Sequence, residues 1–300
     1  GVIACSGTNI YFSLDGDDWI QINKASVAGS GDNYATFNGR STAARTSQGQ
    51  ATFALFEGNS IYGEVIITDK GSGVKPALFK MTGTGSLSNR TYFYEEITVS
   101  GTVFPKFCVV HDKHLVVAGA STALNTIFYS GTSDINSFSS TGSGSIVLDD
   151  QVVGIKSFRT DLIIFCKNSI YKLSNINDAD TIAITPITKN VGCLDGHSIQ
   201  EIGGDLLFLS PDGFRLVAGT ERIGDVELGS VSRQIQSIVS TMAKSIDNFF
   251  ISSAILRSKS QYRFFYSAAT GTTATAKGLI GTITPNGFEW SETIGIQAHG

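Results

Sequence analysis

Charged side chains are scarce in this chain of 300 residues. Asp, Glu, Lys and Arg together make up 16% of the sequence, whereas globular domains commonly reach about 25%. The 22 basic and 26 acidic side chains give a net charge of −4 at pH 7. Tight, nonspecific DNA binding depends on clustered Lys and Arg side chains that neutralise phosphates. The composition therefore gives no support to that class of DNA-binding protein.

Long hydrophobic runs and closely spaced cysteines are also missing. No apolar run approaches the roughly 20 residues that a helix needs to cross a bilayer, so we expect no membrane-spanning segment. The four cysteines, at positions 5, 108, 166 and 193, lack the dense spacing of a disulfide framework. Cys108 and Cys166 lie within apolar runs, which predicts buried free thiols and folding in a reducing compartment.

Motifs of known enzyme chemistry are absent from the sequence. It contains no G-x-S-x-G, no Walker A motif, and no G-x-G-x-x-G that opens a helix. Neighbouring residues of a strand face opposite ways, so the adjacency of carboxylates such as Asp149 and Asp150 does not indicate an acid–base couple. We predict no catalytic residues, no cofactor-binding residues, no cofactor and no enzymatic activity.

Two short segments could bind a metal ion, and we prefer a structural interpretation for each. His111 and His114 occupy an expected hairpin turn, with no third ligand nearby beyond Cys108. The acidic turn that starts at Asp15 lacks the Glu that an EF-hand needs at loop position twelve, where Ser26 stands instead. We therefore predict no metal site.

A recurring tetrapeptide is the most informative feature that is present. A polar turn leads into an Ile-aromatic pair at Ile10, Ile61, Ile127 and Ile170, and Phe214 marks a looser fifth copy. The intervals between these positions are 51, 66, 43 and 44 residues. Repeats of about 40–50 residues built from short strands are typical of a β-propeller. The sequence therefore predicts an all-β chain, a β-propeller of about six or more blades, and equivalent strands for the five positions.

The strands expected within the repeats follow a meander with tight turns. The clearest unit runs through residues 152–158, 161–166 and 169–173, and the next runs through 197–202, 205–210 and 214–217. Gly203-Gly204 and Asp212-Gly213 are strong hairpin signals because these residues accept positive φ. Apolar middle strands, such as 161–166, indicate burial on both faces. We expect Phe165 and Phe208 to be buried between neighbouring blades.

One stretch departs from the β pattern. Apolar residues from Val231 to Met242 recur at helical spacing, which predicts a short amphipathic helix over 231–242 with Ser230 as its N-cap. We treat residues 1–300 as one propeller domain and expect a segment of a longer protein, since both ends read as strand. Residues 23–105 fit the repeat least, so they could include an inserted loop or a small β subdomain.

The segment from Ser13 to Trp19 resembles the Asp-box turn of sialidase-like propellers, S-x-D-x-G-x-T-W, but is one residue short. In that family the box is a structural hairpin away from the active site. The resemblance supports a propeller and implies nothing about activity.

The run from Thr126 to Val217 carries a second resemblance, through the ordered segments Ile127–Ser130, Gly144–Leu148, Leu162–Phe165, Asn168–Leu173 and Phe208–Gly213. It resembles the β-propeller tail nozzle or tail-tube proteins of short-tailed, podovirus-like bacteriophages. The resemblance covers about a third of the chain. It implies a homo-oligomeric ring, usually a hexamer, that extends the tail, together with partners such as the adaptor and tail fibres, and it implies no catalytic residues.

We therefore expect a virion structural protein of the phage tail, assembled in the host cytoplasm. Its ring would form part of the DNA ejection channel, through which double-stranded DNA passes without tight binding. One alternative is a propeller module that binds a host glycan or receptor, for which Trp19 and Trp290 are candidate loop aromatics. A sialidase-like glycosidase is a further alternative, and it would need a cluster of converging arginines.

Overall fold

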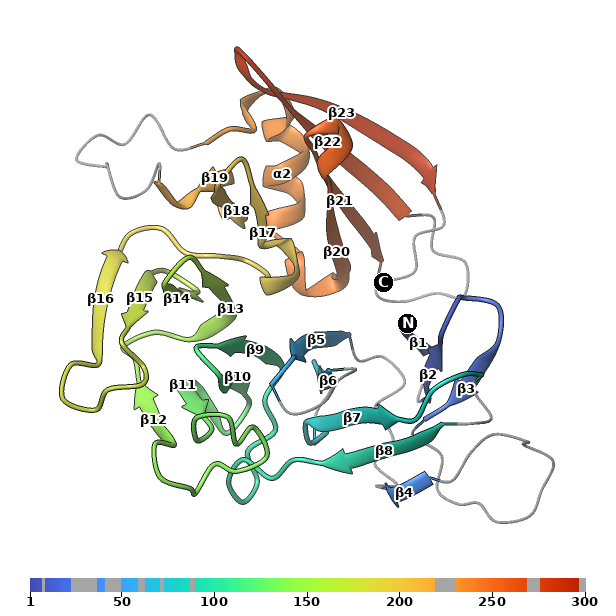
Figure 1. Cartoon of the computed structure of the whole chain (residues 1–300). Helices are drawn as coiled ribbons and strands as arrows, with labels where there is room; N and C mark the ends of the chain where they lie inside the picture. Colours follow the sequence, from blue (N-terminus) through green and yellow to red (C-terminus); the bar gives the residue numbers. More distant parts are fainter. Residues whose placement is uncertain are drawn as a thin grey trace. The chain divides into compact units, whose positions relative to one another are not determined.

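The computed structural model describes most of the chain, and it shows a nearly all-β protein (Figure 1). The described residues are 1–6, 9–22, 37–40, 50–58, 63–70, 73–86, 90–218, 230–268 and 276–296. Their strands form six sheets of three to five strands, each ordered largely as a meander. The six sheets are the blades of a β-propeller, as the repeats predict.

The chain divides into two compact units. Unit 1 contains residues 1–149 and 176–181, and unit 2 contains residues 150–175 and 182–300. The prediction of one propeller domain over 1–300, with an insertion in 23–105, stays a prediction.

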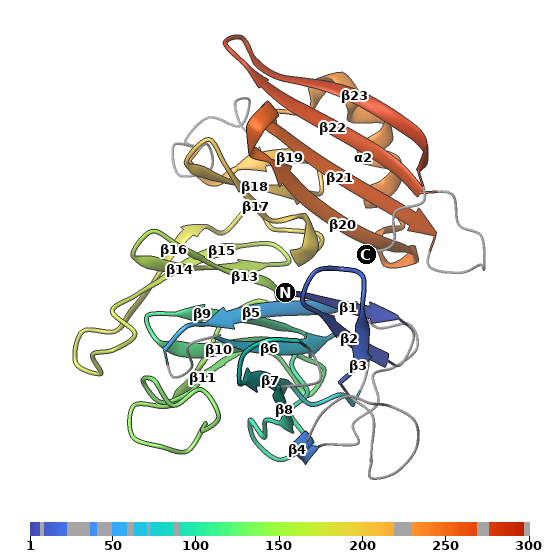
Figure 2. The same cartoon turned by 45° about the vertical axis from the view of Figure 1, so that its right-hand side comes forward.

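Three sheets belong to unit 1 (Figure 2). The first contains β1 (Val2–Ser6), β2 (Asn9–Ser13) and β3 (Trp19–Gln21). The second is ordered β4-β8-β7-β6-β5, from β4 (Phe37–Arg40), β5 (Ala51–Phe56), β6 (Glu64–Asp69), β7 (Ala77–Thr82) and β8 (Thr91–Glu96), with β4 parallel to β8. The third contains β9 (Phe107–His111), β10 (His114–Ala120), β11 (Ala123–Tyr129) and β12 (Gly144–Val147).

Unit 2 holds the other three sheets. The fourth sheet contains β13 (Val152–Phe158), β14 (Asp161–Cys166), β15 (Ile170–Ser174) and β16 (Ala183–Thr188). The fifth contains β17 (Gln200–Ile202), β18 (Asp205–Ser210) and β19 (Gly213–Leu216). The sixth contains β20 (Phe249–Leu256), β21 (Gln261–Ala268), β22 (Ala276–Thr284) and β23 (Gly287–Ile296).

The middle strands are buried along nearly their whole length. Every residue of β10 is buried, and so are the last five residues of both β14 and β18. Phe165 on β14 and Phe208 on β18 are fully buried, with ring centroids 5.2 Å apart. They join two neighbouring sheets of unit 2 through one apolar cluster, which confirms the prediction for both residues.

The repeat positions that the structure describes are all buried in strands. Ile127, Ile170 and Phe214 lie on the third strands of their sheets, β11, β15 and β19, as predicted. Ile10 lies instead on β2, the middle strand of a three-stranded sheet, and Ile61 falls outside the described residues. The tetrapeptide marks a strand with a buried apolar residue, which can occupy more than one place in a blade.

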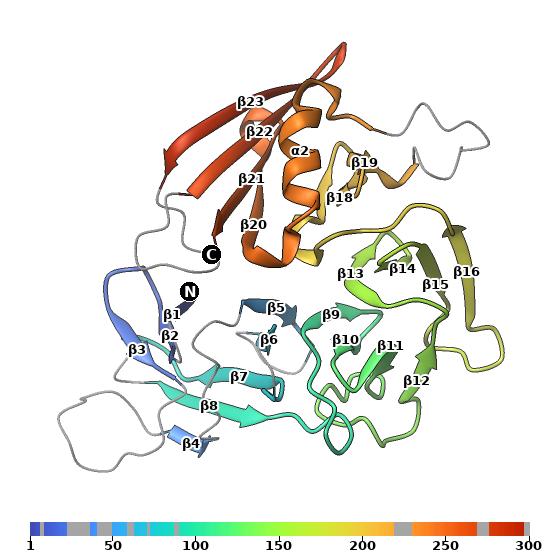
Figure 3. The ribbon, with the colours of Figure 1, turned by 180° about the vertical axis from the view of Figure 1, so that it is seen from behind.

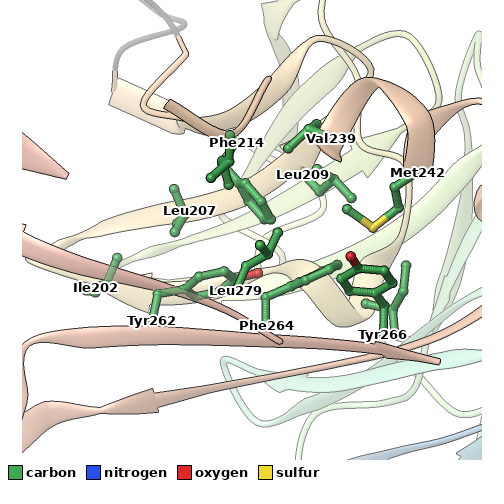
Figure 4. Packing of buried hydrophobic residues seen from close by; sticks show 12 residues of the cluster. Ile202, Leu207, Leu209, Phe214, Val239, Met242, Tyr262, Phe264, Tyr266 and Leu279 are labelled. Atoms are coloured by element: carbon green, nitrogen blue, oxygen red, sulfur yellow. The ribbon is translucent and has the colours of Figure 1, made fainter. Parts of the chain in front are cut away.

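The predicted helix is present but begins later than expected. A 3₁₀ turn at Arg233–Ile235 leads into α2 (Gln236–Ala243), whose Val239 and Met242 are buried. Figures 1 and 3 show α2 against the β20–β23 sheet, and Figure 4 shows the shared core.

The N-cap prediction for Ser230 was wrong. Ser230 forms an isolated β-bridge with Arg215, and the next residue, Val231, donates its backbone N–H to the Phe214 carbonyl at 2.8 Å. The side chain of Ser232 then accepts from the Phe214 N–H at 2.9 Å. Residues 230–232 therefore run beside β19, in the position that the fourth strand occupies in a four-stranded blade.

Replacing Phe165 or Phe208 by Ala should lower the free energy of unfolding by about 3–5 kcal/mol, because each change leaves a cavity between two sheets. The rings touch, so the double variant should deviate from additivity by about 0.5–1.5 kcal/mol. Urea unfolding of the three variants measures both quantities.

Phe250→Ala is the matched control, since Phe250 is 36% exposed on β20 of the same unit. Its effect should stay below about 1 kcal/mol. An equally small effect of Phe165→Ala or Phe208→Ala would contradict the burial of these rings.

Candidate functional site

Strand β5 in unit 1 has one covered face and one open face. Ala54 and Phe56 are buried in a cluster with the β9–β12 sheet, and Cys108 Sγ on β9 lies 3.5 Å from the Thr52 carbonyl oxygen. Phe53 and Leu55 alternate with them on the other face and are 44% and 54% exposed. Large apolar side chains that are exposed side by side on one strand indicate an interaction surface.

The open face of β5 belongs to a sheet surface that is covered on the neighbouring strand β6. Ile67 and Val65 on β6 are the direct cross-strand partners of Phe53 and Leu55, so the four side chains share one face of the sheet. Ile67 is buried, and Val65 partly buried, in the cluster that joins this sheet to the β1–β3 sheet. The β1–β3 sheet thus covers this face at β6 and leaves it open at β5.

Strand β1 forms the edge of the covering sheet. It pairs with β2 alone among the described strands, while Ile3 packs against the cluster shared by the two sheets. The covering sheet ends at β1, while Phe53 and Leu55 lie on the same face as the covered residues of β6. We define the assembly face as Phe53, Leu55 and the edge of β1.

Unit 1 carries a second apolar patch at another edge. Thr126 on β11 pairs with Val147 on the edge strand β12, which places Leu124, two residues before Thr126, on the same face as Val147. Leu124 and Val147 are 40% and 68% exposed. We define these two residues as the β12 patch.

The acidic turn at residues 15–18 is closed by its own polar groups. Asp15 Oδ1 accepts from the Asp17 N–H at 3.1 Å, and Ser13 Oγ accepts from the Gly16 N–H at 2.8 Å. Backbone donors, that of Asp17 foremost, hold the pKa of the Asp15 carboxyl below its usual value. Trp19 Nε1 donates to the Gly16 carbonyl at 2.8 Å. These contacts make the turn a hairpin connection between β2 and β3.

His111 and His114 are cross-strand partners at the β9–β10 hairpin, whose turn residues Asp112 and Lys113 both have positive φ. His114 is fully buried, and its Nδ1–H donates to the Ser130 carbonyl at 2.5 Å. Its Nε2 lies 2.9 Å from Asn177 Oδ1 and 3.1 Å from Thr132 Oγ1. Both ring nitrogens are engaged with protein atoms, so His114 is a structural residue.

One cluster in unit 2 brings together residue types that serve in hydrolases, and the sequence analysis missed it. Asp195 Oδ1 lies 3.1 Å from His197 Nδ1, and Ser198 follows in the next position. Ser198 is fully buried, its hydroxyl donates to the Asp195 carbonyl at 2.6 Å, and it accepts from the Leu209 N–H at 3.1 Å. Tyr262 donates to the Ser198 carbonyl at 2.8 Å. The hydroxyl is committed to the backbone, and the cluster ties β18 and β21 to the segment before β17.

The two tryptophans have different surroundings. Trp19 is 40% exposed on the β2–β3 hairpin. Trp290 lies on strand β23, partly buried against the apolar core of unit 2, rather than in a loop, which corrects the sequence-based interpretation. Its ring stacks on Phe214 with centroids 4.8 Å apart, and its Nε1 donates to the Val231 carbonyl at 2.7 Å. Of the two candidates, Trp19 alone offers an aromatic surface for a ligand.

The cysteines are free thiols, as the sequence predicts. Burial raises the pKa of Cys108, Cys166 and Cys193 to about 12 in each case. These three residues therefore act as small apolar groups at neutral pH.

Two searches of the described residues produced no candidate. No group of three or more His, Cys, Asp and Glu side chains is placed to hold a metal ion there. No described helix has the length and apolar character to cross a membrane.

His114→Ala should lower the free energy of unfolding by about 1–3 kcal/mol, because it leaves buried polar partners unsatisfied. The loss should be the same with and without EDTA, since we predict no metal. Thermal unfolding of wild type and variant in both buffers measures it. A drop in the wild-type melting temperature with EDTA would restore His111 and His114, or the Asp15 turn, as a metal site.

Alkaline pH should destabilise the protein through its buried thiols. A thiol gains charge when it loses its proton, and in an unfolded chain this happens near its ordinary pKa of about 8.5. The folded pKa of Cys108, Cys166 and Cys193 is about 12. Unfolded chains therefore lose these protons first, and the free energy of unfolding falls as pH rises from about 9 towards 12.

Urea unfolding at pH 8 and pH 10 tests this linkage. Iodoacetamide should modify these three thiols in urea but not in the native protein. Rapid modification of all three in the native protein would contradict their burial.

Comparison with protein-family models finds no match, and comparison with curated protein sequences finds none either. Among solved structures, the chain is similar to PorZ, a bacterial surface component of the type-IX secretion system of Porphyromonas gingivalis. The TM-score is 0.40 at 10% identity, over 99% of this chain and 51% of PorZ, so the chain spans about half of that protein. It is also similar to Hsv2p of Kluyveromyces lactis, with a TM-score of 0.38 at 9% identity, over 98% of this chain and 84% of Hsv2p. Neither likeness extends to function.

Proposed function

We propose that this chain is a structural subunit of a bacteriophage tail, one copy in a nozzle or tail-tube ring that forms part of the DNA ejection channel. The assembly face is the observation that carries this proposal. Phe53 and Leu55 expose apolar surface on β5, and both β5 and β1 are edge strands of their sheets. Added strands use both features at once, since main-chain hydrogen bonds supply affinity and the apolar side chains supply specificity. The resemblance of Thr126–Val217 to tail nozzle proteins names the kind of assembly.

The occupant of the assembly face is a second copy of this chain. A closed ring needs head-to-tail contacts between two different surfaces of neighbouring copies. Unit 1 offers two such surfaces, the assembly face and the β12 patch, and both are apolar. The edge strand β12, with Val147 exposed, is the element of the next copy that lies beside β1. Covering Phe53 and Leu55 contributes about 1 kcal/mol each, since both are already half covered.

The low charge of the chain suits a channel that releases DNA. Each phosphate that a protein neutralises adds salt-dependent affinity, which would slow the passage of a duplex. With 22 basic against 26 acidic side chains, the chain has no basic excess. The proposed ring therefore acts in the virion tail without catalysis and without tight DNA binding, alongside tail partners such as the adaptor and fibres.

A glycan- or receptor-binding module is the second candidate, and Trp19 supports it. The indole is exposed and held in place by the Gly16 carbonyl, which suits stacking on a ligand. A glycosidase has less support, because two of the described arginines are engaged locally. Arg159 donates to the Gly204 carbonyl, and Arg215 pairs with Asp212. A glycan array and a fluorogenic sialoside assay distinguish these alternatives.

The wild-type protein should form a ring of defined copy number, and Phe53→Ser with Leu55→Ser should break it into smaller species. Both positions are exposed, so the variant should keep its native circular dichroism spectrum and melting temperature. Native mass spectrometry gives the copy number. Ile294→Ser is the matched control because Ile294 is 73% exposed and lies on β23 of unit 2, outside both patches.

The β12 patch gives an independent test of the head-to-tail contact. Leu124→Ser with Val147→Ser should also break the ring. A mixture of the two double variants retains one intact contact per pair, so it should form heterodimers but no ring. Wild-type protein that stays monomeric at high concentration, or assembly unchanged in both double variants, would contradict the proposal.

A further inference from the structure

A cavity of about 520 Å³ lies between helix α2 and the β20–β23 sheet, within unit 2. Pockets that bind small molecules commonly measure about 300–1,000 Å³ and combine apolar walls with a few polar groups. The proposed ring contacts do not involve this cavity, so what the cavity binds is a separate question.

The floor and one wall of the cavity are apolar. Ile238 and Met242 line it from the helix, and Phe249 and Tyr266 line it from the sheet. The rings of Phe249 and Tyr266 meet edge to face, with centroids 5.6 Å apart. Figure 4 shows Met242 and Tyr266 facing each other from the helix and the sheet. This part of the cavity suits the apolar body of a ligand.

Two opposite charges line the same cavity from neighbouring strands. Lys277 on β22 pairs with Ile294, and Leu279 pairs with Glu292 on β23. Lys277 and Glu292 are thus diagonal neighbours, a relation that places their Cα atoms roughly 7–8 Å apart. Within the described part of the chain, no ion pair of 4.0 Å or less involves either residue. The wall therefore presents a cation and an anion that are separated rather than paired.

The Tyr266 hydroxyl adds an uncharged polar group. Burial raises the pKa of Tyr266, and the negative charge of Glu292 raises it further, so the phenol stays protonated at neutral pH. The phenol can donate or accept a hydrogen bond.

We propose that this cavity binds a small zwitterion with an apolar body, of the class of apolar dipeptides. The ligand carboxylate pairs with Lys277, the ligand ammonium pairs with Glu292, and the ligand side chains pack on Met242, Phe249 and Tyr266. Two residues in extended conformation span at most about 7 Å, which is comparable with the separation of Lys277 and Glu292 along the sheet, so a dipeptide can reach both side chains.

Isothermal titration calorimetry with leucyl-phenylalanine tests the proposal. The wild-type protein should bind it with a dissociation constant below about 1 mM. The same dipeptide with acetylated and amidated ends should bind at least about tenfold more weakly, because it lacks both charges. Glycyl-glycine, which lacks the apolar body, should be weakened to a similar extent.

Matched variants separate the site from general effects of charge. Glu292→Gln and Lys277→Met should each weaken binding by about tenfold or more. Glu289→Gln, on the same strand but away from the cavity, should leave it unchanged, and so should Lys259→Met. Thr241→Trp, from an exposed position on the cavity rim, should fill the space and abolish binding. Retained melting temperatures verify that the variants fold.

The proposal would be overturned by either of two results. One is no heat of binding to the wild-type protein at about 5 mM leucyl-phenylalanine. The other is equal affinity in wild type, Glu292→Gln and Lys277→Met, which would place any binding elsewhere. Either result can be told apart from a failure of ring assembly, because native mass spectrometry measures the copy number in the same samples.

Discussion

The fold depends on the burial of both faces of its sheets. A middle strand such as β14 is apolar on each side, so its sheet needs a cover on each side. Within unit 2, the contact between Phe165 and Phe208 joins one sheet to the next, and the cluster around Phe214 joins the fifth sheet to the sixth. Within unit 1, one apolar cluster lies on each face of the β5–β8 sheet, and Phe53 and Leu55 belong to neither cluster.

This requirement explains the departures from a regular four-stranded blade. The β17–β19 sheet has three strands, and residues 230–232 with helix α2 cover it where a fourth strand would lie. The β1–β3 sheet also has three strands, and the matching position over β5 leaves Phe53 and Leu55 exposed. In the β17–β19 sheet, the chain itself supplies the cover, and a cavity remains beside the helix. The β1–β3 sheet leaves an apolar face, which we assign to a neighbouring copy.

Local sequence signals predict the parts of the fold that local chemistry determines. Asp205–Ser210 matches its predicted strand to the residue, because Gly203-Gly204 and Asp212-Gly213 mark both of its turns. Strand β16 was missed, since Pro186 argues against a strand and is tolerated only because β16 lies at a sheet edge. Ser230 was misassigned as an N-cap because its bridge to Arg215 joins residues 15 positions apart.

The candidate sites could not be predicted in this way. The segment Ala51–Phe56 is apolar apart from Thr52, and the sequence does not show that Phe53 and Leu55 lack a cover. The cavity combines side chains from Ser237 to Glu292, on five elements that only the fold brings together. Trp290 shows the same limit in reverse, since an apparent loop aromatic lies in a strand and packs against the core.

An electron cryomicroscopy map of the native particle tests the central claim most directly. The account predicts this chain in a closed ring on the tail axis, with a strand of the neighbouring copy beside β1 and over Phe53 and Leu55. A map in which the chain is an isolated monomer away from the tail axis, with Phe53 and Leu55 open to solvent, would contradict it.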